Sequence, residues 1–130
     1  MVDLAIAIVN WNTKDLLKAC LRSIFDQTRG LDYQVWVVDN ASSDGSVEMV
    51  KGEFPQVRLI ENMTNVGFTK ANNQVLRQSR GKYVLLLNSD TQVIGNAIKE
   101  LFDFMEAHPE AGAGGCQLLN RDGSFQSSCG

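Results

Sequence analysis

The chain has 130 residues, 44% of them hydrophobic, which is enough for one compact domain that buries a core without disulfides or metals. Twelve basic and fifteen acidic residues give a net charge of −3, and no run of lysine and arginine is present. A protein that binds the phosphate backbone of nucleic acid is therefore not expected.

The cysteines and the N-terminus indicate a cytoplasmic protein. Cys20, Cys116 and Cys129 are odd in number and lack the spacing of metal ligands, so we expect reduced thiols. Residues 1–9 are apolar but have no basic region before them, which favours a core strand over a signal peptide. No segment approaches the roughly 20 apolar residues of a membrane span, although peripheral attachment at the inner face of the membrane stays open.

Strand and helix signals alternate along the first half of the chain. Residues 4–10 form a β-rich run, after which Asn12 or Thr13 can cap a helix whose apolar residues recur at helical spacing to Phe25. The pattern then predicts a strand ending at residue 39, a short helix through about Phe54 and a strand over residues 57–61.

The alternation continues to the end of the chain. We expect a helix that packs with Phe68, Ala71, Val75, Leu76 and Ser79 and ends near Gly81, a fourth strand ending at Asn88, and a helix over 97–105. Residues 111–119 read as a last strand and 120–123 as a hairpin turn. Such alternation predicts an α/β fold with three layers (α/β/α) and a mostly parallel sheet.

Two of the predicted strands change abruptly from apolar to polar residues at their carboxyl ends. The first of them runs over 35–40 and the second over 83–90, and they carry Asp39 and Asp90. Ligands of open α/β sheets bind in the crevice at the carboxyl ends of the strands. We therefore expect both carboxylates to face a binding crevice.

Four motifs, in this order and spacing, resemble one enzyme family. They are Val9-Asn10-Trp11-Asn12, Val37-Val38-Asp39-Asn40-Ala41-Ser42-Ser43-Asp44-Gly45-Ser46, Asn65-Val66-Gly67-Phe68 with Asn72-Asn73, and Leu86-Leu87-Asn88-Ser89-Asp90. Together they resemble the nucleotide-sugar half of the family-2 inverting glycosyltransferases, which have the GT-A fold. The tail at 117–124 is similar to the rhamnosyltransferase subgroup, and the resemblance covers nearly the whole chain.

The resemblance implies transfer of a sugar from a UDP- or dTDP-sugar to a saccharide or lipid-linked acceptor, as in the synthesis of cell-envelope polysaccharides. In this family the general base and most of the acceptor site come from sequence beyond the position that matches Gly130. Residues 1–130 are therefore interpreted as a single donor-binding domain, in which we identify no catalytic base. Apolar surface left uncovered would favour self-association into a homo-oligomer.

The resemblance also assigns nucleotide-binding residues: Asn10, Asn12, Asp39, Asn65, Gly67, Asn72, Asn88 and Ser89. Asp39 can accept a hydrogen bond from the imide N–H of uracil or thymine. Glycine at position 67 lets the main chain approach a ligand. Structural alternatives stay open: helix capping for Asp39 and Asp44, a solvated helix face for Asn72, and a lid over the core for Trp11.

Asp90 matches the metal-binding Asp-x-Asp of the family, so the resemblance implies Mg²⁺ or Mn²⁺ as cofactor. A divalent cation held by a carboxylate and by two phosphate oxygens stabilises the departing diphosphate. The first acid of the motif is replaced by Asn88, whose neutral amide is a weaker ligand. We expect Asn88 to contact the ribose or a metal-bound water instead.

Two other functional classes share features with this chain. A phosphoacceptor receiver domain needs paired acids after the first strand and a lysine after the last, whereas this chain has Asn10-Trp11-Asn12 there and no lysine after residue 99. A module that binds a nucleotide-sugar without transferring it is the stronger alternative, because no base is visible.

Overall fold

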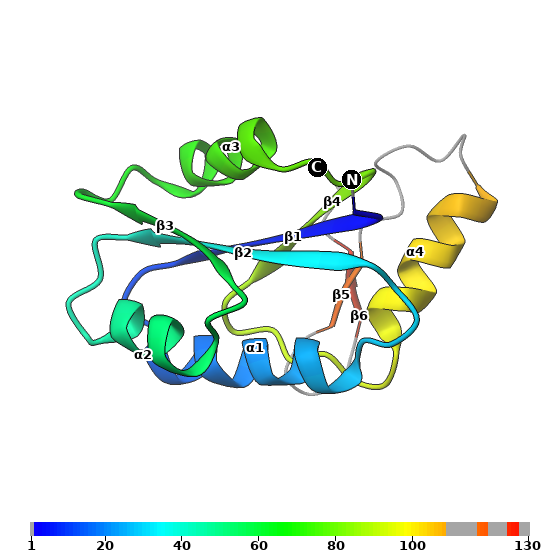
Figure 1. Ribbon diagram of the computed structural model, residues 1–130, viewed down its shortest axis with the longest axis horizontal. Helices are drawn as coiled ribbons and strands as arrows, with labels where there is room; N and C mark the ends of the chain where they lie inside the picture. Colours follow the sequence, from blue (N-terminus) through cyan, green and yellow to red (C-terminus); the bar gives the residue numbers. More distant parts are fainter. Residues whose placement is uncertain (1, 109–116, 120–124, 128–130) are drawn as a thin grey trace.

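The computed structural model describes residues 2–108, 117–119 and 125–127. Four parallel strands form the main sheet in the order β3-β2-β1-β4 (Figure 1): β1 (Leu4–Asn10), β2 (Tyr33–Asn40), β3 (Arg58–Asn62) and β4 (Tyr83–Asn88). The helices are α1 (Lys14–Gln27), α2 (Ser46–Glu53), α3 (Phe68–Gln78) and α4 (Ala97–Ala107). The predicted α/β class and parallel sheet are confirmed.

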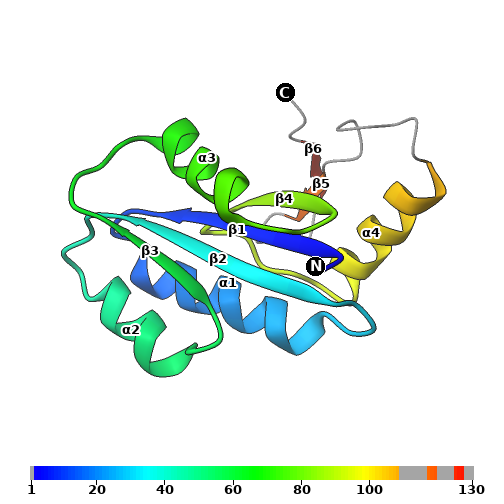
Figure 2. The ribbon, with the colours of Figure 1, turned by 45° about the horizontal axis from the view of Figure 1, so that its top comes forward.

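The sheet is the middle of three layers. Figure 2 shows α1 and α2 on one face of the sheet and α3 on the other. Leu4, Ile6 and Ile8 of β1 belong to the core on the α1 side, and Ala5 and Ala7 belong to the core under α3. Because both faces are covered, β1 reads as a continuous apolar run instead of an alternating one.

The helices and strands end close to the residues predicted from the sequence. Two side chains of α3, however, do not pack as expected. Phe68 and Leu76 are 53% and 50% exposed, whereas Ala71, Asn72 and Val75 are buried. The sheet contacts a stripe centred on Ala71 and Val75, and Phe68 and Leu76 lie beside that stripe. An apolar residue at helical spacing is therefore no proof of burial when the sheet below is narrow.

The start of α1 also differs from the expectation. Thr13 occupies the N-cap position, but its side chain makes no capping hydrogen bond. Its hydroxyl donates to Asn10 Oδ1, and the Lys14 N–H donates to Asp44 Oδ2 at 2.9 Å. A carboxylate from the neighbouring loop thus replaces the local cap.

The last predicted strand does not join the parallel sheet. β5 (Gln117–Leu119) pairs antiparallel with β6 (Phe125–Ser127), and within the described residues this pair forms a sheet of its own. Antiparallel pairing across a short connection agrees with the predicted hairpin. The predicted turn at 120–123 and residues 111–116 lie outside the described residues.

Among the helices that the structure describes, none combines the length and the apolar character needed to cross a bilayer.

Candidate functional site

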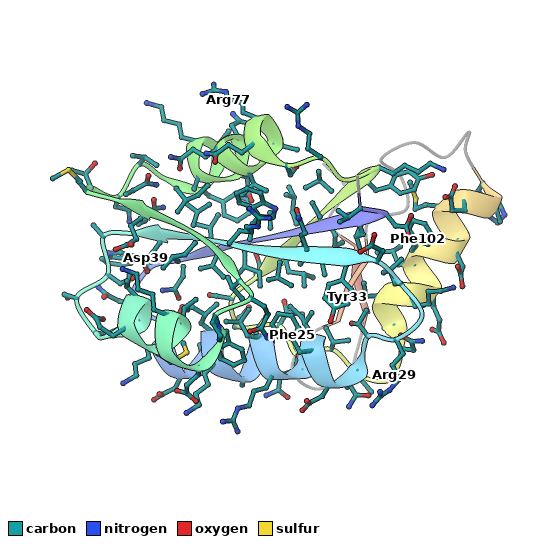
Figure 3. All side chains as sticks on the ribbon, viewed as in Figure 1. Phe25, Arg29, Tyr33, Asp39, Arg77 and Phe102 are labelled. Carbon is teal, nitrogen blue, oxygen red and sulfur yellow. The ribbon has the colours of Figure 1, made fainter. Side chains whose placement is uncertain are left out.

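Polar residues of all four parallel strands meet at one edge of the sheet. In the register, Asn10 lies opposite Asp39, and Val9 lies opposite Asn88. Asn40 lies opposite Asn62 on the next strand. Figure 3 shows Asp39 at this edge, near the loop that leads to α2. The carboxyl edge, as we call this row of strand ends, is where open α/β sheets bind ligands.

A buried hydrogen-bond network joins the ends of β1 and β2. Asn10 is fully buried and donates through Nδ2 to Asp39 Oδ1 at 2.9 Å and to Ser42 Oγ at 3.2 Å. The second carboxylate oxygen of Asp39 accepts the Ser42 N–H at 2.9 Å. Asp39 is only 2% exposed, so these bonds compensate for the cost of burying a charge. Contrary to expectation, Asp39 is enclosed at the edge rather than open to it.

The loops that follow β1 and β2 are bonded to one another. Asn12 donates its N–H to Ser42 Oγ at 2.9 Å and accepts the Ser43 N–H through Oδ1 at 2.8 Å. Asn12 and Ala41 have φ angles of 53° and 63°, which L residues rarely adopt. Such strain persists only where the surroundings fix it, and it is concentrated at functional sites. Trp11 beside them is 55% exposed, so it is not a lid over the core.

Asp44 ties two helix starts together. Its Oδ2 accepts the Lys14 N–H of α1, and its Oδ1 accepts the Ser46 N–H of α2 at 3.1 Å. Burial alone would raise the pKa of Asp44, but the hydrogen bonds from Ser46 and Lys14 together lower it. The capping explanation for Asp44 is therefore confirmed, at the ends of two helices.

A second network holds the loop between β3 and α3. Asn62 and Gln74 exchange two amide hydrogen bonds at 2.9 Å each, and Asn62 also donates to Asn40 Oδ1. The Asn40 amide donates to the Gly67 carbonyl at 3.3 Å. This loop begins α3, so the network fixes the helix start against the sheet.

Gly67 is required by its backbone conformation. Its φ is +87°, and no atom lies within 4 Å of the position that a Cβ would take. The Asn65 side chain accepts the Gly67 N–H at 2.9 Å and closes the turn. The open space beside Gly67 leaves its main chain accessible from the carboxyl edge.

Asn72 stands out because its amide has no partner. It is 4% exposed, and neither Nδ2 nor Oδ1 has a hydrogen-bond partner among the described residues. The alternative of a solvated helix face is therefore wrong for Asn72, whereas Asn73 is half-buried. An unpaired buried donor and acceptor each cost roughly 1–3 kcal/mol, so the Asn72 amide is under-satisfied within the described residues.

The end of β4 supplies the remaining predicted residues. Because the Thr13 hydroxyl donates its hydrogen bond to Asn10 Oδ1, the Ser89 hydroxyl is the donor to Thr13 Oγ1 at 3.0 Å. Asn88 and Asp90 are exposed. The buried Cys20 thiol donates to the Asn88 carbonyl, and burial, helped by the negative charge of Asp90, raises its pKa to about 12. This thiol stays neutral and does not act as a nucleophile.

The oxygen atoms at the carboxyl edge could hold a metal cation only if a bound diphosphate supplied further ligands. No group of three histidine, cysteine, aspartate or glutamate side chains in the described part of the chain lies close enough to hold a metal. Asp90 makes no side-chain hydrogen bond within the described residues and is open to solvent, with the Asn88 amide near it in sequence. Mg²⁺ is commonly held by one or two carboxylates with substrate phosphates and water completing its shell. The residues present fit that arrangement.

The structure therefore brings together most of the predicted residues and adds four that sequence reasoning missed. The additions are Thr13, Asn40, Ser42 and Asn62. Thr13, Asn40 and Ser42 lie within or next to a recognised motif, whereas Asn62 lies three residues before one. Their roles depend on register between strands, which the sequence of one strand does not reveal.

Comparison with known proteins identifies the family. Residues 5–128 match the model of "Glycosyl transferase family 2", so the chain belongs to that family. A poly(ribitol-phosphate) beta-glucosyltransferase of Bacillus spizizenii is 30% identical over 79% of this chain and 17% of its own length. An N-acetylglucosaminyl-diphospho-decaprenol L-rhamnosyltransferase of Mycobacterium tuberculosis is 30% identical over 72% of this chain and 34% of its length.

Solved structures show the same fold. TarS of S. aureus, residues 1–349 in complex with UDP-GlcNAc, superposes with a TM-score of 0.73 at 23% identity, over 82% of this chain and 32% of that one. Mannosyltransferase PcManGT of Pyrobaculum calidifontis, in complex with GDP-Man and Mn²⁺, superposes with a TM-score of 0.71 at 22% identity. The match covers 81% of this chain and 34% of that one. The GT-A fold expected from the sequence is thereby confirmed, and this chain spans about a third of each of these two structures.

Proposed function

We propose that this chain of glycosyl transferase family 2 binds the nucleotide of a UDP- or dTDP-sugar at its carboxyl edge, as the donor-binding part of an enzyme that glycosylates a saccharide or lipid-linked acceptor. The observation that carries the proposal is the buried Asn10–Asp39 pair, which fixes a carboxylate at the strand ends. Support comes from the neighbour TarS, which was solved with UDP-GlcNAc.

Although Asp39 is largely enclosed, its carboxylate lies at the strand ends, and it is proposed to read the base from there. Asn10 and Ser42 use one lone pair on each carboxylate oxygen, which leaves a second lone pair on each for the N3–H of uracil or thymine. Cytosine has an unprotonated N3 and adenine an unprotonated N1, so at the position of the imide N–H each would face the carboxylate with a lone pair. Guanine does carry a ring N–H, and PcManGT binds GDP-Man, so CDP and ADP are the informative comparisons.

The other predicted residues surround this contact. Gly67 and the turn made by Asn65 would bring backbone N–H groups to the nucleotide. The loop with Asn12 and the Ser89 hydroxyl would line the side towards β4, with Asn88 near the ribose. These assignments rest on the carboxyl edge as the shared location of the four loops.

Asp90 is proposed to hold Mg²⁺ or Mn²⁺ together with the diphosphate. When bound, such a cation neutralises charge on the phosphate oxygens of the leaving group. Support comes from the exposed carboxylate at the end of β4 and from the Mn²⁺ in the PcManGT complex. The carboxylate of Asp90 would orient the cation, and Asn88 would bind one of its waters.

Four of the described acids are already engaged by other groups of the chain. Asp44 caps two helices, and Glu61 is paired with Lys51 at 3.0 Å. On α4, Asp103 and Glu106 are paired with Lys99 and Lys82. We therefore propose that the base is not among these residues and that donor binding is separable from transfer. We also place the protein in the cytoplasm, in keeping with its free, buried Cys20.

The first prediction concerns the base. UDP and dTDP should bind at least about tenfold more tightly than CDP and ADP, because a hydrogen bond to a charged acceptor contributes roughly 1.5–3 kcal/mol. Calorimetry on the wild type measures this ratio, and Asp39→Asn should reduce it towards one. Asp44→Asn removes a carboxylate from the same edge and should leave the ratio unchanged. Equal binding of UDP and CDP by the wild type would refute base reading by Asp39.

The second prediction concerns the metal. Mn²⁺ should strengthen UDP binding by about tenfold or more, and Asp90→Asn should abolish that gain while uridine binding stays the same. Asp103→Asn makes the same charge change on α4 and serves as control. If a chelator leaves the UDP affinity of the wild type untouched, Asp90 has no metal role.

The third prediction uses the unpaired amide of Asn72. Asn72→Leu removes two unsatisfied buried polar atoms at similar volume, so we expect the free energy of unfolding to rise by about 1–3 kcal/mol. The same variant should bind UDP more weakly. Asn73→Leu, at the half-buried neighbouring position, should show neither effect. Lower stability of Asn72→Leu would mean that the Asn72 amide is satisfied in the native protein.

The fourth prediction separates binding from transfer. The 130-residue chain should bind UDP-sugar but release UDP no faster with an acceptor than without one. Loss of general-base catalysis alone costs about 10²–10⁴ in rate. The measurement is UDP release with a polysaccharide or lipid-linked acceptor and Mn²⁺ present. Acceptor-dependent turnover that disappears in Asp90→Asn would place the base within this chain.

A further inference from the structure

Positive charge is concentrated in one part of this acidic chain. Residues 62–89 contain no aspartate or glutamate and four cations, Lys70, Arg77, Arg80 and Lys82. The stretch thus carries +4 in a chain whose net charge is −3, which leaves −7 for the rest. Such segregation produces a local positive field although the whole protein is negative.

α3 presents this charge on its outer face. The helix buries Ala71 and Val75 against the sheet, so Lys70 and Arg77, two turns apart, lie on the opposite side. Both are exposed, as is Arg80 just after the helix end. Figure 3 shows Arg77 projecting away from the sheet, on the side opposite to Arg29 of the α1 layer.

Among the described residues, the cations of this face have no acidic partners. Elsewhere, Lys18, Arg22, Lys51, Lys82 and Lys99 each form an ion pair with a carboxylate. Within the described part of the chain, no carboxylate oxygen lies within 4.0 Å of the charged groups of Lys70, Arg77 or Arg80. Their charge is therefore available to an external anion.

A surface hollow lies between these cations. Its volume is about 290 Å³, and its lining is Val66, Lys70, Asn73, Gln74 and Arg77. Gln74 is held in place by its two hydrogen bonds to Asn62. Two cations and amide donors around one hollow are the groups that hydrogen-bond a phosphate oxygen.

Exposed apolar side chains occur on α3 and in the loop before it. Leu76 on the flank of α3 is 50% exposed, and Met63 in the loop before α3 is 96% exposed. Cations with neighbouring apolar side chains match the interface of a bilayer, where headgroups meet acyl chains. A soluble polyanion would gain nothing from Leu76 or Met63, so a lipid surface fits better.

We propose that the outer face of α3, with Lys70, Arg77 and Arg80, docks on an anionic phospholipid surface, and that the hollow between Lys70 and Arg77 receives a headgroup phosphate. Each cation close to such a surface strengthens binding roughly fivefold, so three give about 100-fold. The proposal does not depend on donor binding, because the basic face and the carboxyl edge consist of different residues.

Co-sedimentation with lipid vesicles tests the proposal. The protein should bind phosphatidylcholine vesicles that contain about one third phosphatidylglycerol and should not bind pure phosphatidylcholine vesicles. The triple variant Lys70→Gln, Arg77→Gln, Arg80→Gln should lose about 100-fold in affinity for the anionic vesicles. Binding should also weaken as salt is raised, because the charges are exposed.

A matched variant and a second readout make the test decisive. Lys18→Gln, Arg22→Gln, Arg29→Gln removes the same charge from the opposite side of the sheet and should keep most of the binding. Equal loss in both variants, absence of binding by the wild type, or equally tight binding of soluble heparin would overturn the proposal. UDP calorimetry on the α3 variant should be unchanged, which separates this outcome from failure of the donor site.

Discussion

The hydrogen bond from Asn10 to Asp39 is the contact on which the carboxyl edge depends. A carboxylate that is 2% exposed has lost most of its hydration, so it needs fixed donors, and Asn10 and the Ser42 N–H supply them. The Asn10 Oδ1 atom accepts the hydrogen bond of the Thr13 hydroxyl. The Thr13 hydroxyl oxygen in turn accepts a hydrogen bond from Ser89 in the loop after β4. One buried charge thereby sets the relative positions of three loops that come from β1, β2 and β4.

Asparagines of the strand ends and of α3 differ in whether their amides have hydrogen-bond partners, and we propose that this difference separates structural from binding roles. Asn10, Asn40 and Asn62 all hydrogen-bond to other residues of the edge, so replacing one would leave its partners unpaired. Asn72 is 4% exposed, close to the values for Asn10 and Asn40, but its amide has no hydrogen-bond partner in the described residues. The first group holds the loops that shape the edge, and Asn72 carries an unmet cost that a bound ligand can remove. Replacing an asparagine of the first group should lower the free energy of unfolding, whereas replacing Asn72 should raise it.

The sequence predicted the strands well because their signal is local. Two apolar runs that end in polar residues indicated β2 and β4, and the family motifs indicated the carboxyl edge. Features that depend on distant residues were not predictable. The cap of α1 comes from Asp44, the exposure of Leu76 follows from how little of α3 the sheet covers, and the second network requires the register of β2 and β3. The basic face was missed as well, because its cations are separated in sequence and only the helix aligns them.

The two proposed surfaces have opposite electrostatic requirements, and the length of α3 allows both. The carboxyl edge holds acids and has to admit an anionic diphosphate, which favours a divalent cation there. An anionic membrane repels the same diphosphate within about 8 Å at physiological salt. With 11 residues, α3 is about 16 Å long, so its far end at Arg77 lies roughly two screening lengths from Gly67 at the helix start. The proposed docking face also includes Lys70 in the first turn of α3, so a docked membrane comes closest to the donor site at Lys70 and lies farther from it at Arg77 and Arg80. Arg77 and Arg80 can therefore contribute to membrane attachment while disturbing the donor site less than Lys70 does.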